Sequence, residues 1–133
     1  MSQPPADTVK DVYAAFGRGD IPAILETLDE AVDWRVPETL PHGGSFKGRD
    51  GVGSFFQGIG EHWDGIQVDV EDIVSDGRLV MAVTHIHGTL RATGEQTGYR
   101  SVHVWTVDNG TAVRFGEYVD APTALPAARA AAA

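Results

Sequence analysis

Four ionisable side chains stand at alternating positions within apolar stretches of the C-terminal half of the chain. They are His85, His87, His103 and Glu117. Because side chains alternate across a β-strand, residues two apart share one face. Each of the four thus shares a face with apolar neighbours, among them Met81, Trp105 and Phe115. If the three faces lie on one side of a single sheet, the four groups converge in one apolar patch.

Burying an ionisable group costs several kcal/mol of folding free energy unless the group is paired. Groups with shifted pKa values gather at functional sites. The cluster therefore favours a functional cavity for a small apolar molecule. Two structural alternatives stay open. Each histidine can be a hydrogen-bonded core residue, and Glu117 can simply neutralise a neighbouring imidazolium. A divalent metal held by His85, His87, His103 and Glu117 is a further alternative, although the expectation is a site without metal.

The elements that must position this cluster begin with three predicted helices. The first buries a stripe at i, i+3, i+4 and i+7: Val9, Val12, Tyr13 and Phe16. The second is capped by Asp20 and buries Ile24, Leu25 and Leu28. The third opens at Arg49 or Asp50 and buries Val52, Phe55, Phe56 and Ile59.

Strands are predicted over 32–36, 66–74, 79–90, 99–107 and 113–119, with a loop through the prolines and glycines of 37–44. Turn signals at 75–77 and 108–110 join consecutive strands by hairpins. This order predicts an α+β class, in which three N-terminal helices pack on the concave face of a strongly curved, mainly antiparallel sheet. Residues 1–121 are expected to form one domain, and 122–133 an Ala-rich tail.

Composition excludes several classes of function. The net charge of −9 does not suit binding to nucleic acid. The absence of cysteine excludes disulfides and thiolate metal sites. Neither a signal peptide nor an apolar run of about 20 residues is present, so no membrane association and a cytoplasmic location are expected.

Several short motifs, in this order and spacing, resemble the nuclear transport factor 2-like superfamily, and the likeness is greatest to its SnoaL-like and ketosteroid-isomerase-related branch. They are Val12-Tyr13-Ala14-Ala15-Phe16, Asp33-Trp34, Gly48-Arg49-Asp50-Gly51-Val52 and Phe115-Gly116-Glu117-Tyr118-Val119-Asp120. The resemblance implies a cone-shaped cavity between helices and sheet, and a homodimer packed through the outer face of the sheet. It does not specify a reaction, because one fold hosts many.

The resemblance also implies roles for individual residues. Tyr13 falls where steroid isomerases keep a tyrosine that donates to the oxyanion, and His103 where they keep a second acid. Their catalytic aspartate would fall at Arg35 or Val36, which cannot act as a base, so a strict steroid isomerase is not expected. In epoxide-hydrolase-like members, the water-activating carboxylate falls at Glu117.

In the epoxide-hydrolase-like members, an arginine and an aspartate assist this carboxylate. They would align with His85 and His87, so the chain departs from the epoxide-hydrolase pattern at these two positions. In SnoaL-type cyclases the late acid would be Glu117 or Asp120, and strand parity favours Glu117.

The leading hypothesis is a cofactor-independent enzyme, of isomerase, cyclase, lyase or epoxide-hydrolase type, acting on a carbonyl or epoxide. Glu117 would transfer the proton with a pKa raised by apolar surroundings, and His103 and Tyr13 would donate to the oxyanion. His85 and His87 would orient Glu117 or relay protons. Substrate contacts are expected from Trp34, Phe56, Met81, Trp105 and Phe115. The alternative is a binding protein without catalysis.

A homodimer is expected because the strand faces opposite the cluster are too apolar to be left in water. Those faces are assigned Val80, Ala82, Ile86, Val102 and Val104.

Overall fold

The N-terminal half forms three helices, as predicted. A computed structural model describes residues 3–38 and 40–119, and the helices are α1 (Pro5–Gly17), α2 (Ile21–Thr27) and α3 (Gly48–His62). The side chain of Asp20 accepts a hydrogen bond from the backbone N–H of Ala23 at 3.2 Å, which caps α2. Leu28, predicted on the buried face of α2, instead begins the first strand, and it is fully buried there.

Six strands follow the predicted order, with one addition. They are β1 (Leu28–Val36), β2 (Gly44–Lys47), β3 (Trp63–Asp76), β4 (Leu79–Leu90), β5 (Gln96–Asp108) and β6 (Thr111–Tyr118). The short strand β2 lies partly in the segment predicted as a loop, and β3 and β5 extend beyond their predicted limits.

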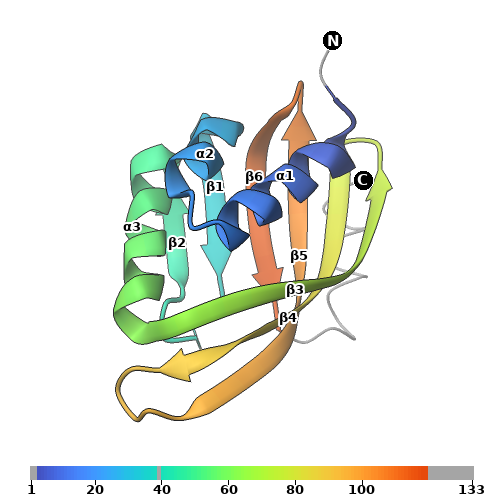
Figure 1. The fold of residues 1–133 in the computed structure, drawn as a ribbon. Coiled ribbons are helices and arrows are strands. Elements are labelled where there is room, and N and C mark those ends of the chain that lie inside the picture. Colours follow the sequence, from blue (N-terminus) through green and yellow to red (C-terminus); the bar gives the residue numbers. More distant parts are fainter. Residues whose placement is uncertain (1–2, 39, 120–133) are drawn as a thin grey trace.

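The six strands form one mixed sheet in the order β2-β1-β6-β5-β4-β3 (Figure 1). β1 and β6 run parallel, and the other neighbours run antiparallel. β4, β5 and β6 are contiguous, as predicted. The connection between β5 and β6 passes through Asn109 and Gly110, both with positive φ, as a tight hairpin of twisted strands requires.

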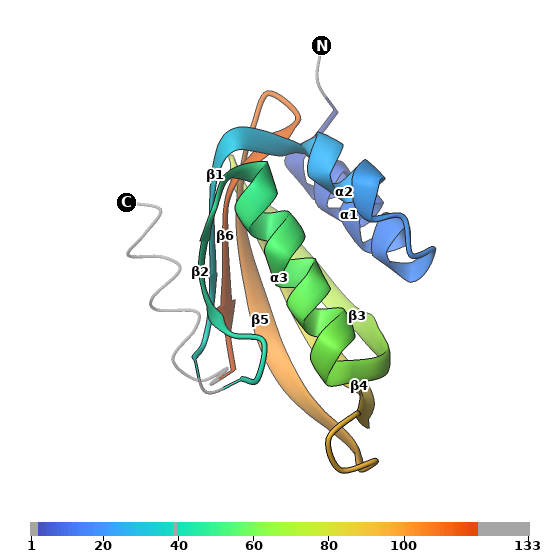
Figure 2. The ribbon, with the colours of Figure 1, turned by 90° about the vertical axis from the view of Figure 1, so that its left-hand side faces the viewer.

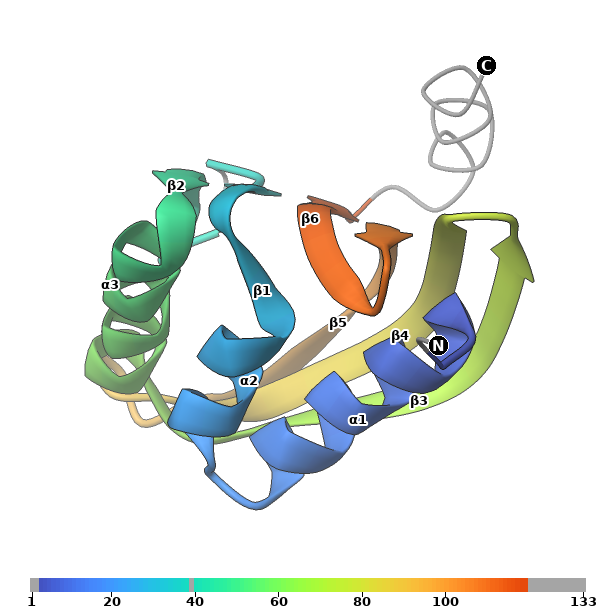
Figure 3. The ribbon, with the colours of Figure 1, turned by 90° about the horizontal axis from the view of Figure 1, so that it is seen from above.

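All three helices lie on one face of the sheet (Figure 2). Seen from above, β3, β4 and β5 bend around α1 and α2, so that the helices occupy the concave side (Figure 3). The main core lies between these layers and joins residues of α1, such as Val9 and Val12, to Trp34, Trp105 and Phe115 of the sheet. The prediction of an α+β fold with helices on one face of a curved sheet is thus confirmed.

A second, smaller apolar cluster lies on the outer face. Val102 and Val104 form its centre, and Leu79, Met81, Val83 and Tyr118 pack against them. No helix within 3–38 and 40–119 is long and apolar enough to cross a membrane. The Ala-rich tail predicted at 122–133 lies outside the described residues, as does Asp120.

Candidate active site

The register of β4 against β5 divides the predicted cluster between two faces of the sheet. His103 is paired with Ala82, and Ser101 with Thr84. Directly paired residues share a face, so the inner face of β4 carries Val80, Ala82, Thr84 and Ile86. His85 and His87 have the other parity and lie on the outer face. Their predicted place beside His103 and Glu117 is therefore wrong.

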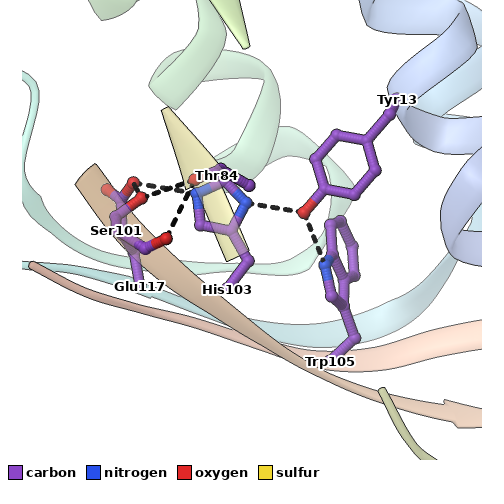
Figure 4. Close-up of polar contacts among 6 residues, drawn as sticks. All are labelled: Tyr13, Thr84, Ser101, His103, Trp105 and Glu117. Carbon is purple, nitrogen blue, oxygen red and sulfur yellow. Dashed lines mark hydrogen bonds and ion pairs between the residues drawn. The ribbon is translucent and has the colours of Figure 1, made fainter. Parts of the chain in front are cut away.

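The remaining predicted residues meet on the inner face as a hydrogen-bonded chain (Figure 4). The hydroxyl oxygen of Tyr13, on α1, lies 2.6 Å from Nδ1 of His103, on β5. Nε2 of the same imidazole lies 2.9 Å from Oε2 of Glu117, on β6. His103 and Glu117 are each less than a tenth exposed.

The hydrogen-bond partners of each group fix the positions of the protons in this chain when His103 is neutral. The indole Nε1–H of Trp105 donates to the hydroxyl oxygen of Tyr13 at 3.1 Å. Tyr13 then donates its own proton to Nδ1 of His103, and the Nε2–H of His103 donates to Glu117. Both ring nitrogens of His103 are thus engaged within the protein. The predicted direct donation from His103 to a substrate oxyanion does not fit this arrangement, and Tyr13 forms the end of the chain that lies on α1.

Glu117 is held as a carboxylate. Ser101 donates to Oε2 at 2.9 Å, and the hydroxyl of Thr84 lies 2.8 Å from that of Ser101. Burial raises the pKa of Glu117, but the hydrogen bond from His103, the positive charge of its protonated form and the bond from Ser101 outweigh burial and leave the pKa below its ordinary value. The predicted rise in this pKa is therefore wrong, and the carboxylate is suited to act as a base or charge partner.

The pKa of Tyr13 is shifted in the opposite direction to that of Glu117. Its burial, next to the negative charge of Glu117, raises its pKa, although the bond from Trp105 partly offsets this. The phenol is therefore neutral at physiological pH. It can exchange its proton but does not persist as a phenolate.

The chain forms part of the wall of an apolar pocket between the helices and the sheet. Tyr13, His103 and Glu117 line it, together with four residues predicted to contact substrate: Trp34, Phe56, Trp105 and Phe115. Met81, the fifth, packs in the outer cluster instead. The pocket has a volume of about 60 Å³, against about 300–1,000 Å³ for typical ligand sites. Aromatic side chains make up much of the wall, and Trp34 stacks on Phe115 with ring centroids 4.0 Å apart.

Two further polar residues of the pocket lining, His42 and Tyr99, escaped the sequence prediction. Nδ1 of buried His42 accepts from the indole N–H of Trp63 at 3.1 Å, so the neutral ring carries its proton on Nε2. Burial lowers the pKa of His42, which favours this neutral form. The hydroxyl of Tyr99 and Nε1 of Trp34 are buried without a hydrogen-bond partner among the described residues. Each is a donor that a bound oxygen could satisfy.

The metal alternative loses its geometric basis. The proposed metal set of His85, His87, His103 and Glu117 is split by the sheet. Arg35, at the position of the missing aspartate, is exposed and paired with Asp33 at 3.3 Å.

Comparison with known proteins agrees with this architecture. The model of the SnoaL-like domain matches residues 9–115. An uncharacterized protein of Mycobacterium tuberculosis is 30% identical over 121 residues, covering 89% of this chain and 90% of the relative. A nuclear transport factor 2-like protein of Burkholderia thailandensis superposes with a TM-score of 0.84 at 30% identity, covering 96% of this chain and 98% of that one.

A Xanthomonas campestris protein, provisionally described as a polyketide cyclase, has a TM-score of 0.71 at 25% identity, with 90% and 92% of the two chains covered. The family match spans most of the chain and agrees with the resemblance found in the motifs. The chain therefore belongs to the SnoaL-like branch of the nuclear transport factor 2-like superfamily.

Proposed function

We propose that this protein is an enzyme that moves protons on a small apolar carbonyl compound, without a cofactor. The observation that carries the proposal is the buried Tyr13–His103–Glu117 chain in the wall of an aromatic pocket. A proton donor, an imidazole and a carboxylate linked in this order also make up hydrolytic triads, in which the carboxylate orients the imidazole and stabilises its protonated form. The similarity to a protein described as a polyketide cyclase supports carbonyl chemistry.

In the proposed reaction, the oxygen of Tyr13 takes a proton from the carbon next to the substrate carbonyl. At the same time the phenolic proton of Tyr13 passes to Nδ1 of His103. Tyr13 thus remains neutral throughout, as its raised pKa requires. The products of the step are an enolate and an imidazolium paired with ionised Glu117. Return of the proton through Tyr13 to another atom completes an isomerisation or cyclisation.

The developing enolate oxygen needs donors, and the pocket offers two. The unpartnered Nε1–H of Trp34 and hydroxyl of Tyr99 can donate to it. Rearrangement of the aromatic lining would open the pocket toward the cone-shaped cavity implied by the resemblance.

The test is proton exchange on simple ketones. Aryl ketones and cyclohexenones are incubated with the protein in D₂O, and deuterium incorporation next to the carbonyl is followed by NMR. The substitutions Tyr13→Phe and Glu117→Gln should each lower the enzymatic exchange rate about 10²- to 10⁴-fold, the usual effect of losing an acid/base group.

Matched controls are available on the surface. Tyr118→Phe removes a hydroxyl from the outer cluster, and Glu61→Gln removes a carboxylate from the exposed side of α3. Both should leave exchange unchanged. Full exchange by Glu117→Gln would refute the proposed role of the chain.

A ligand-binding protein without catalysis is the second candidate, favoured by the almost wholly apolar pocket lining. The same experiment separates the two. Saturable binding of an aryl ketone, seen by quenching of Trp34 and Trp105 fluorescence, without deuterium exchange would support this candidate.

We further propose that the protein forms a homodimer through the outer face. The predicted face needs correction, because Val80, Ala82 and Ile86 lie on the inner side. The outer cluster around Val102 and Val104 is apolar, and nearby Val74 is 51% exposed. Light scattering at micromolar concentration should give twice the chain mass, and Val104→Asp should give a monomer. A wild-type monomer would contradict the proposal.

A further inference from the structure

The outer face carries a second cluster of metal-ligating side chains, separate from the pocket. His85 and His87 lie two residues apart on β4, and Asp69 on β3 is paired with His85. Each residue contributes one donor atom, and all three donor atoms lie within 4.8 Å of one another. The geometry points to a site for a divalent transition-metal ion of the zinc class, held by Asp69, His85 and His87.

The side chains are already close to a ligating arrangement. Nε2 of His87 lies 2.8 Å from Oδ2 of Asp69, and the imidazole rings of His85 and His87 lie with centroids 5.2 Å apart. Ligands about 2.0–2.1 Å from a tetrahedral zinc ion are about 3.3 Å from each other. The donor atoms lie at most 4.8 Å apart, so the longest donor–donor distance must shorten by roughly 1.5 Å. Rotation of the side chains at the surface can supply this change. The backbone, fixed by the β3–β4 ladder, need not move.

The neighbouring strand leaves room for the two rings. Gly98 on β5 is paired with His87, and a β-carbon there would lie 3.1 Å from Nε2 of His85. Arg100 on β5 is paired with His85, and its guanidinium contacts the carboxylate of Glu71 at 3.2 Å. The charge of Arg100 is thus balanced by Glu71, and the carboxylate of Asp69 remains to balance the charge of the metal ion.

The donor set selects the class of ion. Two imidazoles and one carboxylate suit zinc, cobalt, nickel or copper, whereas magnesium and calcium prefer oxygen ligands alone. Three protein ligands leave at least one coordination position for water. The side chain of Asp69 is 62% exposed and that of His87 36% exposed, so an ion can reach the site from solvent.

The test uses untagged, chelator-treated full chain and Zn²⁺ as the only ligand. Isothermal titration should show one saturable Zn²⁺ per chain, and Co²⁺ should give a visible absorption band that Zn²⁺ abolishes. The substitutions His85→Gln, His87→Gln and Asp69→Asn should each weaken Zn²⁺ binding about tenfold or more. All three side chains lie on the outer face, so the urea midpoint of unfolding should stay within error.

His62 supplies the matched control. It is an exposed histidine at the end of α3 whose Nδ1 lies 2.9 Å from the carbonyl oxygen of Gly58. His62→Gln should leave the titration unchanged. The absence of saturable binding, another stoichiometry, or equal losses in His62→Gln and His85→Gln would overturn the site. In the last two cases zinc binds elsewhere, and in the first the Asp69–His87 contact is only an ion pair.

Discussion

Replacing His103 with leucine should reverse the way Glu117 contributes to stability as pH changes. Removing the partner of a buried carboxylate leaves an uncompensated charge, at a cost of about 3–5 kcal/mol. Here the side chains of His103 and Glu117 are only 7% and 4% exposed, and one donor, Ser101, would remain on the carboxylate. The variant should therefore lose about that much unfolding free energy at pH 7.

The sign of the pH effect follows from the pKa of Glu117. In the native protein this pKa lies below that of the unfolded chain, about 4.3. The carboxylate therefore adds stability above pH 4.3, and this is lost as pH falls through the folded value. Without His103, burial dominates and raises the folded pKa of Glu117. Its stabilising contribution is then present at acidic pH and is lost as pH rises toward the raised value.

The assay compares His103→Leu with His103→Leu/Glu117→Gln by urea unfolding at pH 4 and pH 7, followed by tryptophan fluorescence. The double variant should be more stable than the single one at pH 7 by about 1.4 kcal/mol for each unit by which the folded pKa exceeds 4.3. At pH 4 the two should agree. Equal stabilities at pH 7 would show that Glu117 is not a charge held by His103.

Two further predictions concern the segment that holds His42. A β-carbon at Gly43 would lie 1.9 Å from the backbone oxygen of Pro37, so Gly43→Ala should cost more than about 2 kcal/mol in urea unfolding, whereas Gly58→Ala, with open space around it in α3, should gain about 0.5–1 kcal/mol. An unchanged Gly43→Ala protein would contradict the packing of this loop. Trp63→Phe leaves Nδ1 of His42 without its donor and should cost about 1–3 kcal/mol by the same measurement, and a cost near zero would mean that water replaces the indole.

The sequence was sufficient to predict elements whose periodicity is strong. β4 begins and ends where the alternation of 79–90 predicts, and the stripe that includes Val12 and Tyr13 places the hydroxyl of Tyr13 on the sheet side of α1. Strand β2 was missed because four residues, two of them exposed, show no clear alternation. Its pairing with β1 depends on contacts that no local pattern reports.

The inner face of β4 could not be chosen from the sequence, because both of its faces are apolar over the first half. Leu79, Met81 and Val83 look as suitable for a core as Val80 and Ala82. Only the pairing of Ala82 with His103 decides between them, and register is a property of two strands. By contrast, Tyr99 shares parity with His103, so its place in the pocket was within reach of the same argument.

The position of β6 between β1 and β5 has a consequence for how the chain folds. β6 alone joins the β2–β1 pair to the β5-β4-β3 ribbon, and its parallel contacts connect Leu28 with Ala112, about 80 residues apart. Bringing the two ends of so long a segment together costs conformational entropy before packing contacts can stabilise the pairing. During synthesis, β1 leaves the ribosome well before β6, the strand that pairs with one of its edges. One edge of β1 therefore stays unpaired until one of the last strands is synthesised. Folding is expected to be slow, and the chain prone to aggregation, until β6 pairs with β1.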